Sequence, residues 1–101
     1  METLKETLLR VMAGYAGEAL NGDLYLTTNE DAGVYVVVGI ADDVDERVVD
    51  AGLVVRLAQE KIVIEYDGND KPLYKTLIQA GIPRAQIILA YVGERMEAVK
   101  S

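Results

Sequence analysis

The densest group of side chains that could do chemistry is the run Asp42-Asp43-Val44-Asp45-Glu46, with four carboxylates in five residues. Carboxylate oxygens are the ligands that Ca²⁺ and Mg²⁺ prefer, so a cation site or a carboxylate-based metal enzyme is the first chemistry to weigh. An EF-hand loop spaces its acids around a glycine and ends in glutamate, and this run lacks that pattern. Polar clusters between strands are usually solvated loops. We therefore predict a hairpin loop here and no metal site.

A second polar group, Asp67-Gly68-Asn69-Asp70, follows a predicted strand and precedes a predicted helix. Ligands bind at this kind of position in some open sheets. A phosphate-binding loop would need a second glycine and a lysine, and the segment has neither. A turn followed by a helix cap at Asn69 or Asp70 accounts for all four residues. We predict a structural role for them.

Composition removes most of the remaining catalytic chemistries. The 101 residues include no cysteine and no histidine. Ser-His-Asp and Cys-His sites and cysteine-based zinc sites therefore cannot form. Paired carboxylates could serve acid–base catalysis, but no pattern places two of them in one buried cleft. We predict no catalytic, metal-binding or cofactor-binding residue, no cofactor, and a protein that is not an enzyme.

The charge balance bears on partners and location. The net charge is −7, from 17 acidic and 10 basic residues, and the basic residues are scattered along the chain. Such a field repels a phosphate backbone, so direct nucleic-acid binding is disfavoured. The first residues carry acids where a signal peptide carries bases, and no apolar stretch approaches the ~20 residues of a membrane span. Together with the lack of cysteine, this predicts a cytoplasmic protein without a membrane segment.

Seven elements must position these groups. Apolar residues at helical spacing predict a helix over 3–20, with a capping box at Thr3 and Glu6 and a stop at Asn21-Gly22. A second helix is predicted over 70–80, and the tail from Glu94 is polar. Strands are predicted over residues 23–28, 34–41, 47–58, 61–66 and 86–92.

The order α-β-β-β-β-α-β predicts one α+β domain over residues 1–101. We expect a five-stranded, largely antiparallel sheet with two helices packed on one face, because short loops join the first four strands.

The other face of that sheet is predicted to be apolar too. Faces of this kind are rarely left in water, so a second copy or another protein is expected to cover it. Tyrosine suits interfaces, although core packing is the alternative for Tyr66, Tyr74 and Tyr91. The candidate partner-binding residues are Tyr25, Val37, Val54, Val63, Tyr66 and Tyr91, and Val49 is a further member of this face.

An ordered series of motifs resembles the XisI family, the fdxN element excision controlling factors of cyanobacteria. The series is Lys61-Ile-Val-Ile-Glu-Tyr-Asp67, then Leu77-Ile-Gln-Ala-Gly-Ile-Pro83, then Ile87-Ile-Leu-Ala90. The similarity is closest over residues 53–91. The chain departs from the family at Gly39-Ile40, where the family has Gly-Trp, and at Tyr91-Val92-Gly93, where it has Phe-His-x-Pro.

The resemblance implies a non-enzymatic controlling factor. Such a factor would bind an XisH-like, nuclease-like protein and support a site-specific recombinase that excises a DNA element during heterocyst development. Two alternatives are a DNA-binding, recombination-directing module and an antitoxin-like inhibitor of a nuclease-like partner, the latter permitted by the acidic charge. A homo-oligomer formed through the second sheet face is a further alternative.

Overall fold

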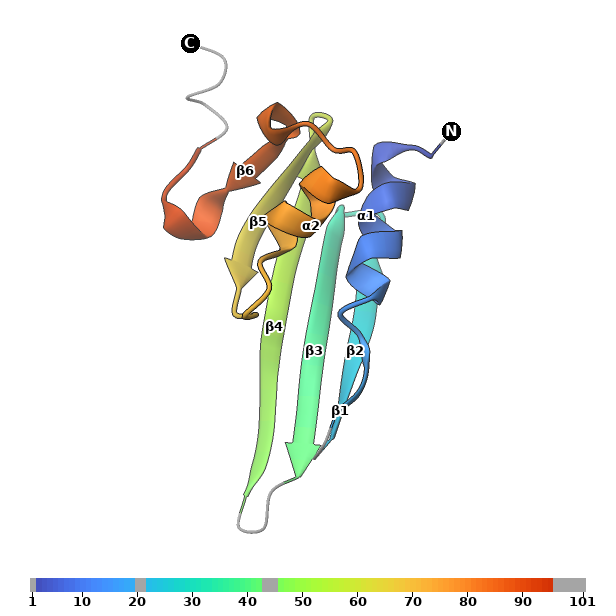
Figure 1. Cartoon of the computed structure of the whole chain (residues 1–101). Coiled ribbons are helices and arrows are strands. Elements are labelled where there is room, and N and C mark those ends of the chain that lie inside the picture. The colour runs from blue at the N-terminus through green and yellow to red at the C-terminus, as the bar shows by residue number, and fades with distance from the viewer. Residues whose placement is uncertain (1, 20–21, 43–45, 96–101) are drawn as a thin grey trace.

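The computed structural model describes residues 2–19, 22–42 and 46–95 (Figure 1). Within these ranges two α-helices and six strands follow one another in the predicted order, except that an additional short strand follows the first helix. The elements are α1 (Leu4–Ala13), β1 (Gly17–Ala19), β2 (Gly22–Asn29), β3 (Val34–Asp42), β4 (Arg47–Ala58), β5 (Lys61–Asp67), α2 (Leu73–Gln79), the 3₁₀ turn η1 (Arg84–Gln86), β6 (Ile87–Leu89) and the 3₁₀ turn η2 (Ala90–Val92).

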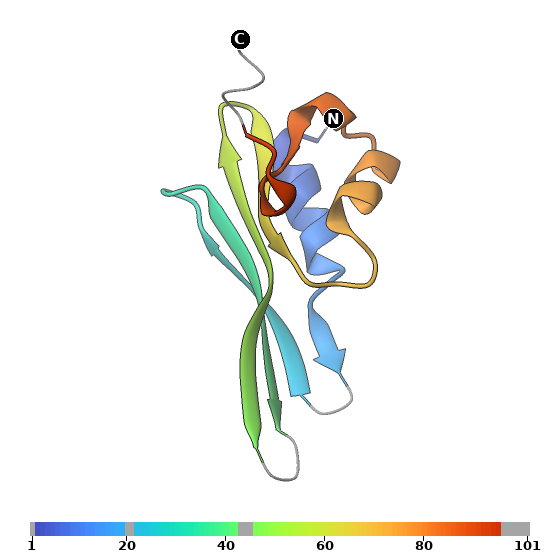
Figure 2. The same cartoon turned by 90° about the vertical axis from the view of Figure 1, so that its left-hand side faces the viewer.

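The strands form a single sheet in which spatial order follows chain order, from β1 to β6. Every neighbouring pair is antiparallel except β5 and β6, which run parallel because α2 carries the chain back between them. Both α-helices cover the same face of the sheet (Figure 2). The predicted α+β class, the five predicted strands and the largely antiparallel arrangement are confirmed. The short edge strand β1 was not predicted.

Helix α1 begins where the sequence predicts and ends earlier. The Thr3 hydroxyl accepts the Glu6 N–H at 3.1 Å, and the Glu6 carboxylate accepts the Thr3 N–H at 2.9 Å. The predicted end at residue 20 is wrong, because the helix stops at Ala13 and the chain turns into β1. Gly14 caps the helix, and Gly17 has a φ of +134°, which only glycine adopts readily.

Helix α2 is shorter than predicted and has a different cap. It starts at Leu73, whose N–H is accepted by the Asp67 carboxylate at 2.8 Å. The other Asp67 oxygen accepts the backbone and side-chain amides of Asn69, at 3.0 and 2.9 Å. The segment is thus a turn and a cap, as predicted. The N-cap position is Pro72, which makes no side-chain hydrogen bond to the helix, and Asp67 at the end of β5 accepts the first N–H in its place; the prediction of a cap at Asn69 or Asp70 was wrong.

The β3–β4 and β4–β5 hairpins differ in how much of the turn the structure describes. Gln59 and Glu60 join β4 to β5 with φ values of 54° and 62°, the backbone of a tight two-residue hairpin turn. The turn between β3 and β4 includes residues 43–45, so Asp43 and Asp45 of the predicted acidic loop lie outside the described residues. The described part of the chain holds no group of three or more acidic side chains arranged to bind a metal ion.

The hydrophobic core lies between the sheet and the two helices. Its side chains come from both helices and from the helix-covered face of β3 to β6. The fully covered members are Leu8, Met12, Tyr35, Leu53, Val55, Ile62, Ile64, Leu73, Leu77 and Ile87. In the described ranges, no helix has the length and apolarity to cross a membrane.

The last element is also shorter than its sequence suggests. Residues 86–92 were predicted as one strand, but only Ile87–Leu89 pair with β5, and the chain then turns through η2. Gly93 has a φ of +100°, which completes this turn and sends the chain back along β6. Glu94, predicted to begin a loose tail, is held by two hydrogen-bonding partners.

Candidate interaction surface

No helix of the described residues covers the sheet face opposite α1 and α2 (Figure 2). Directly paired residues of antiparallel strands point to the same face, so the register defines this surface. Tyr25 pairs with Val38, and Val36 pairs with Val54, which in turn pairs with Tyr66. We call these five residues the open face. Tyr25 and Tyr66 are 50% and 49% exposed, whereas the three valines are half-buried.

Three of the six candidate residues from the sequence lie on the open face: Tyr25, Val54 and Tyr66. The placement of Val37 there was wrong. It pairs with Leu26 and Leu53 on the helix-covered side and is 3% exposed in the core. Apolar residues occupy consecutive positions in β3, so alternation alone cannot assign its faces, and a shift of one residue exchanges them.

The remaining two candidates are placed differently. Val63 pairs with Arg56 of β4 but is only 2% exposed, so it offers a partner little surface. Tyr91 lies on η2, beyond the edge strand, and is 37% exposed. Partial burial, followed by the nearby Asp67 carboxylate, raises the pKa of its hydroxyl above the usual range. Tyr91 therefore lies near Asp67, where the chain leaves β5 for α2, and not on the open face.

Beyond the helices the sheet continues as a projecting arm, in which Val38–Asp42 of β3 lies between β2 and Arg47–Ala51 of β4 (Figure 1). The arm contributes to a longest dimension of 51 Å. Val48 pairs with Ala41 and Val49 with Ile40, so the two valines point to opposite faces of the sheet. They are 39% and 58% exposed. The sequence indicated Val49 as part of the second apolar face. It did not indicate that Val48 is exposed, because the face of the strand that carries Val48 was expected to be covered by the helices.

The arm is also the most acidic part of the chain. Between Asp42 and Asp50 the sequence has five acidic residues and one arginine, which accounts for more than half of the net charge of −7. On the arm Arg47 pairs with Asp42 at 3.8 Å, and beside the open face Arg56 pairs with Glu65 at 2.6 Å. Asp23 accepts a hydrogen bond from the Tyr25 hydroxyl at 3.3 Å, and its charge raises the pKa of that hydroxyl.

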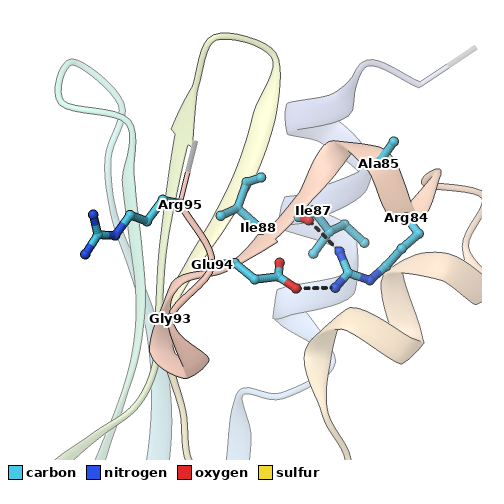
Figure 3. Close-up of a pocket in the computed structure, with 7 residues that line it drawn as sticks. All are labelled: Arg84, Ala85, Ile87, Ile88, Gly93, Glu94 and Arg95. Atoms are coloured by element: carbon cyan, nitrogen blue, oxygen red, sulfur yellow. Dashed lines mark hydrogen bonds and ion pairs between the residues drawn. The ribbon is translucent and has the colours of Figure 1, made fainter. Parts of the chain in front are cut away.

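The outer edge of β6 is closed by side chains (Figure 3). Arg84 donates to the Ile87 carbonyl at 2.7 Å, and Glu94 accepts the Leu89 N–H at 2.8 Å. The two side chains pair with each other at 2.7 Å. The Leu89 N–H and then Arg84 hold the pKa of Glu94 below its usual range. We call this arrangement the edge clamp. It occupies backbone groups that a further strand would use.

A depression of about 490 Å³ lies against the edge clamp, lined by Arg84, Ala85, Ile87, Ile88, Gly93, Glu94 and Arg95. Its central charged groups, Arg84 and Glu94, already satisfy each other and the backbone of β6. Arg95 points away from both (Figure 3). The depression therefore has no convergent set of free polar groups of the kind that orients a small ligand.

Comparison with known proteins gives a family match and similar solved structures. The family described as XisI protein matches residues 2–100. The structure of an XisI-like protein from Anabaena variabilis is similar with a TM-score of 0.67 and 17% identity, over 85% of this chain and 78% of that one. The fdxN element excision controlling factor XisI from the same organism gives 0.64 and 21%, over 94% and 92%. These two likenesses show the fold. No curated protein matches significantly.

Proposed function

The chain belongs to the XisI family, and we propose that it is a non-enzymatic accessory factor acting through protein–protein contact in the excision of a DNA element by a site-specific recombinase. The link to excision comes from the structural relative described as an fdxN element excision controlling factor. The partner in this proposal is an XisH-like, nuclease-like protein, as the family resemblance implies. The protein is proposed to act in the cytoplasm, where such a recombinase works.

The observation that carries the proposal is the open face. Two tyrosines that are half exposed flank a strip of valines on a sheet surface that neither α1 nor α2 covers. Large aromatic residues with an apolar ring and a polar tip are enriched at protein interfaces. Burying apolar area on association is favourable by roughly 25 cal/mol per Å² before the costs of binding are counted. A sheet face of this composition is suited to a protein surface.

No catalytic step is part of the proposal. The chain has neither histidine nor cysteine, so its own side chains offer only carboxylates, lysines, tyrosines and hydroxyls. The pKa shifts at Glu2 and Glu94 are depressions caused first by a hydrogen-bonding partner, Arg10 and the Leu89 N–H respectively. Carboxylates held ionised in this way serve structure better than proton transfer at neutral pH.

Co-expression with an XisH-like protein tests the proposal. We expect a stable complex that co-purifies with the tagged chain. The double variant Y25S/Y66S should bind at least about tenfold more weakly, because central aromatic residues often dominate interface energy. Ile78→Ser is the matched control, since Ile78 is 41% exposed on α2, on the opposite side of the sheet. Absence of any complex, or equal weakening by the control, would contradict the proposal.

The acidic arm favours a second candidate function, antitoxin-like inhibition of the nuclease-like partner. An acidic projection can cover a basic DNA-binding surface through electrostatic complementarity. Cleavage of a plasmid by the partner, with and without this chain, measures it, and no protection at equimolar concentration would exclude it. A gel-shift assay at low salt separates both candidates from a DNA-binding module, because phosphate contacts are strongest there.

A further inference from the structure

The sheet has edges that differ in how they are closed. At β6 the edge clamp takes up the Ile87 carbonyl and the Leu89 N–H. On β4, strand β5 pairs only with Leu53–Ala58. At Gly52 the carbonyl accepts the Gly68 N–H at 3.0 Å and the Asn69 side chain at 3.2 Å. The next five residues, Arg47–Ala51, have β3 on one side, and no strand of the described ranges 2–19, 22–42 and 46–95 lies on the other.

This unclosed stretch of β4 lies on the arm, where side chains on both faces are exposed. Val48 and Val49, on opposite faces, are 39% and 58% exposed. A long, exposed, apolar edge is an aggregation hazard that proteins usually block with charges, bulges or a covering segment. Here the edge clamp blocks β6, whereas Arg47–Ala51 carries the charges of Arg47 and Asp50 but is covered by no segment that the structure describes. Strand β2 also has a stretch beyond Leu24 that β1 does not pair, but there Leu26 packs against the core and the last three residues, Thr27, Thr28 and Asn29, are polar.

We propose that the β4 edge of the arm, Arg47–Ala51, accepts an added β-strand from a basic segment of a partner protein. Main-chain hydrogen bonds to the edge would supply affinity, and side chains alternating along the added strand would supply specificity. Apolar residues of that strand pack beside Val48 and Val49. Its lysines or arginines face the acids of the arm. The inference rests on the proposed protein-binding function and names one way in which the partner is held.

Charge selects a basic segment over a second copy of this chain. A second arm added in the parallel sense would set its acidic end beside the acidic end of the first. In the antiparallel sense, that acidic end would lie beside the turn after β5, which carries Asp67 and Asp70. Like charges directly opposite each other on paired strands are destabilising, whereas opposite charges stabilise. Both self-pairings are therefore repelled, and a lysine-containing strand is attracted.

The first test uses two labelled peptides of identical composition. One is acetyl-Lys-Val-Lys-Val-Lys-Val-amide, which alternates as a strand requires, and the other is acetyl-Lys-Lys-Lys-Val-Val-Val-amide. Fluorescence anisotropy at low salt should show the alternating peptide binding at least about tenfold more tightly. Hydrogen exchange should show added protection confined to residues 47–51. Equal affinity for the two peptides would reduce the interaction to non-specific attraction by the acids and overturn the proposal.

Two proline variants, V48P and V49P, provide the second test. Neighbouring residues of a strand direct their N–H groups to opposite edges, so one variant removes an N–H from the free edge and the other removes one from the pairing with β3. Thermal melting identifies the variant that leaves the fold intact, and that variant should lose binding of the alternating peptide. Retained binding in the folded variant would overturn the proposal.

A charge variant keeps the test sharp if both prolines unfold the arm. The variant E46K/D50K keeps every backbone N–H of the strand and should lower the affinity for the alternating peptide at least about tenfold. Unchanged affinity would overturn the proposal. Self-association of the wild-type chain that the folded proline variant abolishes would also overturn it, in favour of a second copy. If the partner protein still binds the proline variants but not Y25S/Y66S, strand addition fails while the proposed function stands.

Discussion

Replacing Glu94 with alanine should destabilise the fold although Glu94 lies near the chain end. One carboxylate oxygen accepts the Leu89 N–H at 2.8 Å, and the other pairs with Arg84 at 2.7 Å. Leu89 is 8% exposed, so its N–H would lose its partner in a place that water reaches poorly. An unsatisfied buried donor costs about 1–3 kcal/mol. Because the Glu94 side chain is 39% exposed, water will offset part of this, and we expect about 1.5 kcal/mol.

For a domain of this size, that loss lowers the melting temperature by roughly 6–12 °C, which calorimetry or circular dichroism resolves easily. Glu94→Gln should lie between wild type and Glu94→Ala, because the amide oxygen still accepts the Leu89 N–H but carries no charge. The matched control is Glu30→Gln. Glu30 forms an ion pair of similar length, 2.6 Å to Lys5, with both side chains about half exposed and without a backbone N–H. The control should melt close to wild type.

The effect should also depend on pH. The folded-state pKa of Glu94 lies below its ordinary value, so its contribution is fully present above that ordinary value, about 4.3, and is lost as pH falls through the folded pKa. The difference between wild type and Glu94→Gln should therefore be largest at neutral pH and shrink below about pH 4. Equal melting of Glu94→Ala and Glu30→Gln, or a gap that does not change with pH, would refute this account of the edge clamp.

Three further outcomes follow from described contacts. Leu53→Ala should cost about 3 kcal/mol in urea unfolding, because Leu53 is fully buried at the sheet centre; a loss below 1 kcal/mol would contradict its core role. Asp67→Ala should cost about 2 kcal/mol and speed hydrogen exchange in the first turn of α2, since three N–H donors lose their acceptor; unchanged exchange would count against the cap. The variant Q59N/E60G should raise the melting temperature by a few degrees, because both positions have positive φ; an unchanged or lower value would contradict the turn assignment.

Local sequence signals determined much of the fold. Strand β4 was predicted with its observed bounds, because turn residues mark both ends of a run rich in β-branched residues. The cap of α1 was found because Thr3 and Glu6 have the spacing of a capping box. In both cases the deciding interaction lies within a few residues along the chain.

Predictions failed where contacts distant along the chain, or ambiguous periodicity, decide the structure. Apolar residues at helical spacing continue to Ala19, so β1 was hidden inside the predicted helix; the glycines at 14 and 17 turned the chain instead. The face of Val37 could not be read from a run of apolar residues. Glu94 looked like part of a loose tail, because its partners Arg84 and Leu89 become neighbours only after the chain turns back at Gly93.

Three of the six residues predicted from the sequence to bind a partner lie on the open face. Tyr25 and Val54 were found because alternation in their strands is regular, whereas Tyr66 reaches this face only because the register of β4 and β5 shifts between Val54 and Val55. The unclosed edge of β4 was not found, because an edge is a property of which strands lie beside one another and how far each extends. Only the register shows that the pairing of β4 with β5 ends at Leu53, while β4 itself extends to Arg47.

The matching of spatial order to chain order in the sheet has a consequence for how the chain folds. Each strand from β2 to β5 pairs with the strand just before it in the chain, so the loops to be closed are short and their entropic cost is small. Such low contact order favours folding faster than most sheet proteins achieve. Only β6 must wait, since it reaches β5 through α2 in a parallel crossover. Its docking, secured by Glu94 after the turn at Gly93, is therefore expected to be the last step of folding and the first to open on unfolding.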